Sequence, residues 1–193
     1  PSAARFVARH LYNFFVADEA EVPAWQRTGP RDPEAIKLLE EEYYKSGYNI
    51  GAMLKVLFNS DFFKNARFEK VKSPTEVVIG TMRLVRDFTE PKLGLNPLAN
   101  NIRYMGQDLM NPPTVEGWHT GKEWIDSGTL VERINFAADQ LGNTGLPGVK
   151  DIVSRIESEK ITNPEGLVDR CLEMVGSYQL ADETRGQLVE HAG

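Results

Sequence analysis

Two carboxylates and one imidazole that could move protons lie near one another in a loop rich in proline and glycine. They are Asp108, Glu116 and His119, and Pro112-Pro113 lies between the first two. A carboxylate beside an imidazole can serve as a general acid or base when both groups reach the reacting atom. Polar residues also gather in exposed loops by chance, so a loop without chemistry remains the alternative.

Aromatic side chains surround these titratable residues. Tyr104, Trp118 and Trp124 could together form a platform on which a sugar face or another planar ligand stacks. The alternative is that the tryptophans fix the loop onto neighbouring helices, since large aromatic rings dominate protein cores. We expect Trp118 to be largely buried, against the first helix or the helix predicted at 129–141.

No familiar catalytic or cofactor motif accompanies these side chains. The sequence contains no His-x-x-His, Cys-x-x-Cys or His-Glu-x-x-His spacing, which argues against a histidine or cysteine metal site. It also lacks the Gly-x-Ser-x-Gly nucleophile motif, a phosphate-binding glycine loop and a dinucleotide fingerprint. We therefore predict no metal and no cofactor, and the question of an enzyme activity stays open.

Packing is the simpler explanation for two other residues that could react. His10 lies between Phe6 and Phe14 on the apolar arc of the first predicted helix, which favours a hydrogen-bonded core histidine over a catalytic base. Cys171 shares a helix face with Leu167 and is expected to be a small buried hydrophobe.

The composition is that of a globular protein and excludes several classes of partner. Hydrophobic residues make up 41% of the 193 residues and charged residues 26%, which is too apolar for a disordered chain. The formal charge of −6 argues against binding to a nucleic-acid backbone. No apolar run approaches the roughly 20 residues that a membrane-spanning helix needs. The protein partner remains unknown at this point.

The elements that must position the loop are predicted to be helices. Asp32-Pro33 and Asn49 are typical helix starts, and Ser73-Pro74-Thr75-Glu76 forms a capping box. In the first helix, an apolar arc is expected to face the core, with Arg5, Arg9 and Asn13 opposite. We predict an all-α, irregular bundle of eight or nine helices with a long Gly/Pro/Trp loop. The helices are expected at about 3–16, 33–45, 50–58, 74–88, 95–109, 129–141, 149–159 and 164–176, and from about 182 onward.

One break in the domain organisation is predicted. Glycine and proline cluster at 142–148, between two helical segments. We therefore expect residues 1–141 to form the main core, and residues 142–193 to form appended helices packed on the same domain.

Five segments resemble the C-terminal part of the bacterial DUF1800 family in order and spacing. The most specific combines Gly106-Gln107, Pro112-Pro113, Gly117-Trp118 and Trp124. The others are 1–15, 47–63, 72–78 and 133–136.

The resemblance implies a mostly helical protein that is exported or periplasmic in bacteria, with no assigned activity and therefore no catalytic residues to carry over. It also implies that sequence N-terminal to this chain could complete a site and act as its partner. Two hypotheses follow. The first is a helical structural or interaction module without catalysis. The second is a glycan- or peptide-binding, or hydrolytic, site at the 104–124 loop.

Overall fold

The computed structural model describes all residues except 1, 91–92, 119, 177 and 179. Over that part of the chain it contains ten α-helices and two short 3₁₀ helices, with no strand beyond an isolated bridge between Thr114 and Gly117. The predicted all-α class is confirmed. None of the helices described is long and apolar enough to cross a membrane.

The chain divides into two compact units. The first comprises residues Pro1–Ile79 and Leu93–Phe136, and the second comprises Gly80–Lys92 and Ala137–Gly193. The predicted division at 141/142 stays a prediction. The structure adds that residues 80–92 group with the C-terminal helices.

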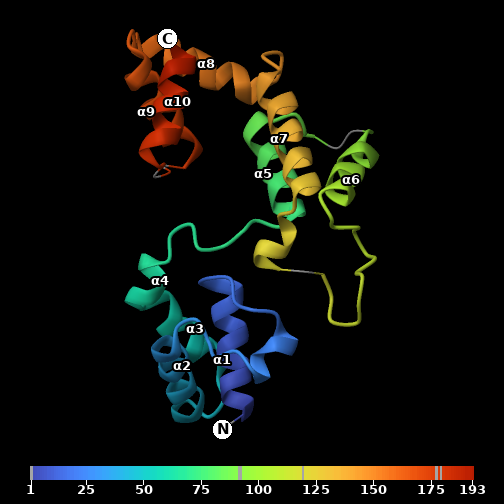
Figure 1. Cartoon of the computed structure of the whole chain (residues 1–193), viewed down its shortest axis with the longest axis vertical. Coiled ribbons are helices and arrows are strands. Elements are labelled where there is room, and N and C mark those ends of the chain that lie inside the picture. The colour runs from blue at the N-terminus through green and yellow to red at the C-terminus, as the bar shows by residue number, and fades with distance from the viewer. Residues whose placement is uncertain (1, 91–92, 119, 177, 179) are drawn as a thin grey trace. The chain divides into compact units, whose positions relative to one another are not determined.

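Most of the first unit is built from the N-terminal helices, and Figure 1 shows α1, α2 and α3 side by side. Its elements are α1 (Ser2–Phe15), η1 (Val22–Gln26), α2 (Pro33–Lys45), α3 (Ile50–Asn59), α4 (Asp61–Asn65), α6 (Leu95–Tyr104), η2 (Gly121–Trp124), the start of α5 (Pro74–Val85) and most of α7 (Ser127–Gly142). The second unit holds the ends of α5 and α7 together with α8 (Pro147–Glu159), α9 (Pro164–Val175) and α10 (Asp182–Ala192).

The predicted helix starts are confirmed by their hydrogen bonds. The Asp32 carboxylate accepts from the amide of Ala35 at 2.9 Å, and the Asn49 side chain accepts from the amide of Ala52 at 3.1 Å. The amide of Ser73 donates to the Glu76 carboxylate at 2.8 Å, which is the reciprocal half of a capping box. Capping side chains that lie only three residues from the amides they bind therefore decide where these helices begin.

The face that α1 buries differs from the predicted one. Ala4, Ala8, Arg9 and Tyr12 are the buried residues of this helix. Phe6 and Phe14, which were expected in the core, are 52% and 71% exposed. The small alanines let α1 approach its neighbours closely, and a buried ion pair lets Arg9 enter the interior. The prediction that Arg9 lies on the solvent side is wrong.

Cys171 is exposed, so the prediction of a buried cysteine is also wrong. Its neighbour in the same helix, Val168, is 7% exposed and provides the buried contact of α9 instead. On α9, Val168 therefore faces the interior and Cys171 faces solvent.

The start of α8 lies directly against the end of α5 within the second unit. A Cβ added to the buried Gly148 would lie 2.8 Å from the Cα and carbonyl carbon of Val85, and nearer still to the carbonyl oxygen of Leu84. Because these atoms belong to the backbone of a helix, they cannot rotate away. Only glycine fits at this contact.

We expect Gly148→Ala to lower the free energy of unfolding of the second unit by about 1–3 kcal/mol, the usual cost of overpacking. Hydrogen exchange of the α8 amides measures it. The matched control is Gly186→Ala in α10, where nothing lies within 4 Å of an added Cβ. That change should stabilise its helix by about 1 kcal/mol. Wild-type protection of α8 in Gly148→Ala would contradict the tight contact.

Candidate functional site

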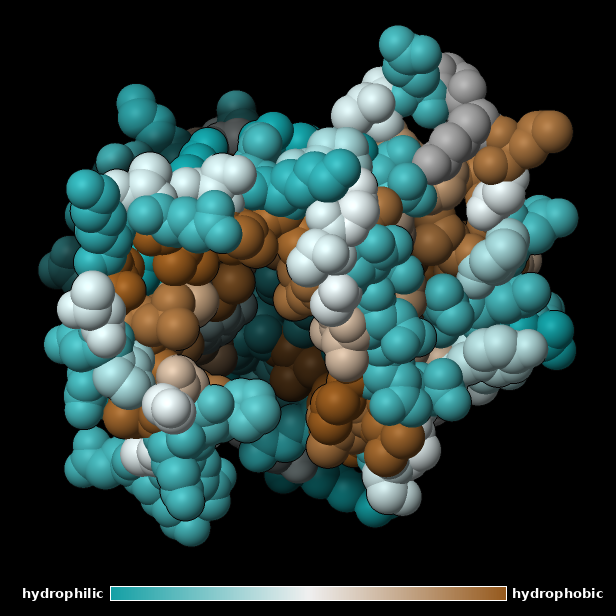
Figure 2. Space-filling view, turned by 90° about the horizontal axis from the view of Figure 1, so that it is seen from above, coloured by the Kyte–Doolittle hydropathy of each residue, from teal (hydrophilic) through white to brown (hydrophobic). Residues whose placement is uncertain are grey.

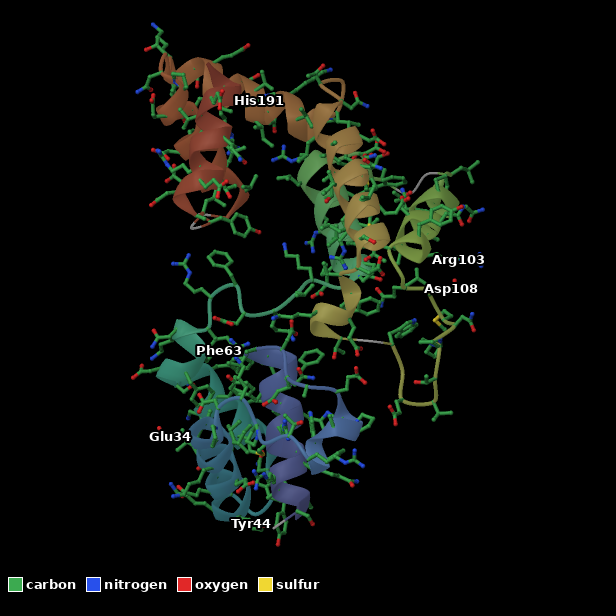
Figure 3. All side chains as sticks on the ribbon, in the orientation of Figure 1. Glu34, Tyr44, Phe63, Arg103, Asp108 and His191 are labelled. Carbon is green, nitrogen blue, oxygen red and sulfur yellow. The ribbon has the colours of Figure 1, made fainter. Side chains whose placement is uncertain are left out.

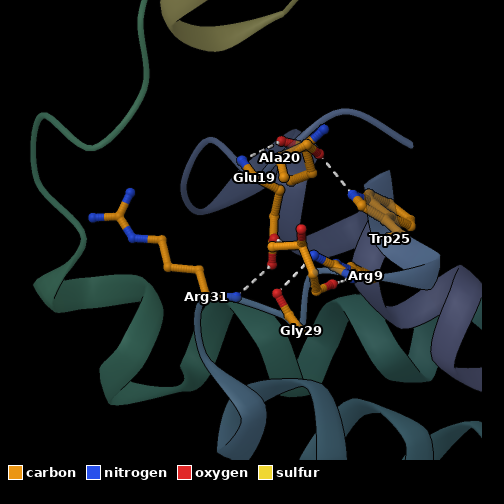
Figure 4. A network of polar contacts seen from close by, with 8 residues as sticks. Arg9, Glu19, Ala20, Trp25, Gly29 and Arg31 are labelled. Atoms are coloured by element: carbon orange, nitrogen blue, oxygen red, sulfur yellow. Dashed lines mark hydrogen bonds and ion pairs between the residues drawn. The ribbon is translucent and has the colours of Figure 1, made fainter. Parts of the chain in front are cut away.

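A buried ion pair fixes the segment that follows α1. The Arg9 guanidinium donates to the Glu19 carboxylate at 2.9 Å, and their side chains are only 3% and 2% exposed. Arg9 also donates to the carbonyls of Thr28 and Gly29, both at 2.9 Å, and lies over the Trp25 ring (Figure 4). Because every partner lies in residues 19–29, this single arginine sets the position of η1 relative to α1.

Glu19 is held from its other side as well. Its second carboxylate oxygen accepts from the amide of Arg31 at 3.0 Å, and its own amide donates to the Asn13 side chain at 3.0 Å. The Trp25 indole donates to the carbonyl of Ala20 at 2.6 Å. The segment between α1 and α2 is therefore held by several hydrogen bonds, although its sequence is rich in glycine, proline and charge.

A second anchor joins this region to the segment before α5. The Asp18 carboxylate accepts from the amide of Val71 at 2.7 Å and from the Lys70 ammonium at 3.0 Å. Lys70 also donates to the carbonyl of Asn13 at 2.6 Å. Gly121 packs on Asp18 with φ +63°, and a Cβ there would lie 3.0 Å from that of Asp18. Glycine therefore lets the start of η2, which follows the long loop, approach the segment after α1.

The long loop, residues 106–120, is bonded to α5 at its start and is also bonded across its own width. At its start, the Gln107 side chain accepts from the amide and the hydroxyl of Thr75, at 3.0 and 2.7 Å. Near its end, the Trp118 indole donates to the carbonyl of Asp108 at 3.1 Å. The first pair of bonds fixes the start of the loop against α5, and the indole bond draws Trp118 towards Asp108.

Trp118 in the long loop and Trp124 in η2 have different environments. Trp118 is half-buried and shares a cavity with α1, one of its two predicted neighbours. Most of its surface is covered, which agrees with the prediction that it is largely buried. Trp124 is the buried one, at 5% exposure, and its ring lies against Gly106 while Thr129 donates to its carbonyl at 3.0 Å.

A cavity of about 600 Å³ lies between α1, η1 and the end of the long loop. Its apolar lining includes Leu11, Phe14, Phe15, Val22 and Trp118. Glu21, Glu116 and Glu123 line it as well, and all three are exposed. It is thus an apolar hollow with carboxylates at its rim.

His10 lies at the edge of this cavity. Its ring is 4.3 Å from that of Phe6 and 4.7 Å from that of Trp25, measured between centroids. Burial lowers the pKa of His10 below its usual value of 6.5. The imidazole is therefore neutral at pH 7 and adds no positive charge to the cavity.

The structure distributes the predicted site residues over several places. Glu116 and Trp118 line the cavity beside α1. Asp108 and Trp118 line a separate hollow of about 460 Å³ with Pro112 and Pro113. Tyr104 is 62% exposed at the end of α6 and lines neither. Asp108 is approached by Arg103, with 3.9 Å between guanidinium and carboxylate (Figure 3). His119 lies outside the described residues.

Sequence reasoning missed Phe14, Val22 and Glu21 as residues of the site. The available signal was the spacing of Phe6, His10 and Phe14, which places them on one helix face, but that face was assigned to the core. No group of three or more histidine, cysteine, aspartate or glutamate side chains suited to a metal ion occurs among the residues that the structure describes.

The family profile described as "Protein of unknown function (DUF1800)" matches residues 1–193, the whole chain. The chain belongs to the DUF1800 family. The family resemblance inferred from the five segments is confirmed, and its description assigns no activity. Searches of curated proteins and of solved structures found no match. The DUF1800 membership therefore leaves the function to be argued from the cavity of the first unit.

Proposed function

We propose that this chain is a helical interaction module that binds a partner in the cavity beside α1. The observation that carries the proposal is exposed aromatic surface on a hydrogen-bonded frame. Phe14 is 71% exposed, yet it lines a cavity of about 600 Å³ together with Trp118. Ligand sites in proteins typically enclose about 300–1,000 Å³ and are lined mostly by apolar and aromatic side chains.

The contacts that hold the walls of the cavity support this role. The Arg9–Glu19 pair positions η1, Gly121 positions the loop against Asp18, and the Trp118 indole is bonded to the loop backbone. A cavity whose walls are already ordered loses little conformational entropy when it is filled. Exposed apolar residues also occur outside this cavity, Leu93 and Leu95 among them. Figure 2 shows apolar surface on one face of the molecule.

Catalysis is not part of the proposal. A hydrolytic site needs a base within hydrogen-bond reach of a nucleophile or water that it activates. Asp108 and Glu116 line different cavities, so these two carboxylates do not face one reacting atom. The second hypothesis is retained only in its binding form, with Glu116 and Trp118 as the contact residues.

The test is a fragment screen on the uniformly ¹⁵N-labelled whole chain, observed by two-dimensional NMR. We expect amide shifts to cluster at residues 10–15, 20–23 and 114–120. As a control, the amides of α9 and α10 should not move. Fragments that bind only elsewhere, or the absence of any hit, would overturn the proposal.

The family resemblance also leads us to propose that this protein is bacterial and exported. Fractionation of a bacterium that expresses the epitope-tagged protein should recover it outside the cytoplasm. Recovery in the cytoplasmic fraction alone would contradict this part of the proposal.

A further inference from the structure

The geometry points to a peptide segment as the occupant of the cavity, one that carries a lysine or arginine next to an apolar side chain. This inference rests on the proposed function and adds the chemistry of the partner. It is drawn from the lining of the cavity and from the balance of charges at its rim.

The apolar part of the cavity accounts for the apolar side chain of the partner. Leu11, Phe15 and Val22 line it, and the rings of Phe14 and Trp118 contribute aromatic surface. An aliphatic or aromatic side chain placed there would remove its own surface and that of these residues from water, which favours binding. Phe14 also packs edge-on against Phe15, with 4.6 Å between the ring centroids.

Two carboxylates at the rim have no cation paired with them in the part of the chain that the structure describes. Glu21 and Glu116 form no ion pair within the described part of the chain. The cation that lines the same cavity, Lys70, is already bonded to the Asp18 carboxylate at 3.0 Å. His10 is uncharged at pH 7 because burial lowers its pKa. The unpaired carboxylates of Glu21 and Glu116 therefore favour a cation on the partner, although Arg5 lines a neighbouring hollow with Glu116.

The two parts of the cavity lie close enough for one short segment to meet both. Glu116 and Trp118 are two residues apart in the same loop, and Glu21 directly precedes Val22 at the start of η1. A cationic side chain beside an apolar one would thus contact a carboxylate and an aromatic face together. Aromatic faces also attract cations directly. Phosphate or carboxylate ligands would instead meet like charge.

Two capped pentapeptides test the inference, Gly-Phe-Lys-Leu-Gly and Gly-Phe-Glu-Leu-Gly, titrated into the ¹⁵N-labelled whole chain. We expect the lysine peptide to bind at the cavity at least tenfold more tightly than the glutamate peptide, and to weaken as salt is added. Glu21→Gln with Glu116→Gln should remove most of that preference. Glu132→Gln, an exposed glutamate of α7 outside the cavity, should leave it unchanged.

The outcomes separate this inference from the proposed function. Equal binding of both peptides at the cavity would overturn the cationic partner and leave the interaction module intact. Tighter binding of a neutral oligosaccharide, with cellotetraose as the probe, would overturn the peptide. Failure of both peptides while fragments still bind the cavity would also overturn it. Failure of every probe, fragments included, would overturn the proposed function as well.

Discussion

Replacing Arg9 by methionine is expected to lower the free energy of unfolding of the first unit by about 3–5 kcal/mol, the usual result of removing one partner of a buried pair. The change leaves the Glu19 carboxylate 2% exposed without its counter-ion. It also leaves the carbonyls of Thr28 and Gly29 without the guanidinium donor. Urea denaturation followed by tryptophan fluorescence measures the loss, because Trp25, Trp118 and Trp124 all lie in the first unit.

The matched control is Arg5→Met, one turn earlier on α1, where the arginine is exposed. It should change stability by no more than about 0.5 kcal/mol. The double variant Arg9→Met with Glu19→Leu should recover part of the loss, since both charges are then gone. A single Arg9→Met variant as stable as Arg5→Met would show that the pair does not hold the loop.

The second large effect is expected from Trp124. Removing its buried ring by Trp124→Ala should cost about 3–5 kcal/mol, from lost apolar burial and the cavity left behind. The same substitution at Trp118 should cost less, because that ring is half-buried and already borders a cavity. Parallel urea denaturation of the two variants, followed by circular dichroism, provides the comparison. A larger loss for Trp118→Ala would reverse the roles assigned to the two rings.

Much of the helical layout could be predicted from the sequence, because local side chains decide it. Asp32, Asn49 and Ser73 accept hydrogen bonds at helix starts or lead a capping box, and those contacts span only a few residues. The face of α1 could not be predicted in this way. Periodicity assigns arginine to solvent, whereas Arg9 is buried by partners ten to twenty residues away. A pattern of hydropathy does not record such a partner.

Only part of the candidate site could be predicted, because some of its residues stand out in the local sequence and others are placed by distant contacts. Glu116 and Trp118 stood out because their loop is unusual in sequence, and both line the cavity. Phe14 and Glu21 did not, because their importance depends on where α1 turns its aromatic face and on how η1 is anchored. Nor does the sequence say which tryptophan is buried. Trp124 lies against Gly106 through a contact 18 residues apart in the sequence, which only the folded loop creates.

The most direct test of the central claim is the dissociation constant of the best cavity-binding fragment for Phe14→Ala beside the wild type. Tyr44→Ala is the control, since Tyr44 is a half-exposed aromatic residue of α2 outside the cavity. The account predicts that Phe14→Ala weakens binding at least tenfold while its stability stays within about 0.5 kcal/mol of wild type. Binding that is unchanged in Phe14→Ala would contradict the assignment of this cavity as the binding site.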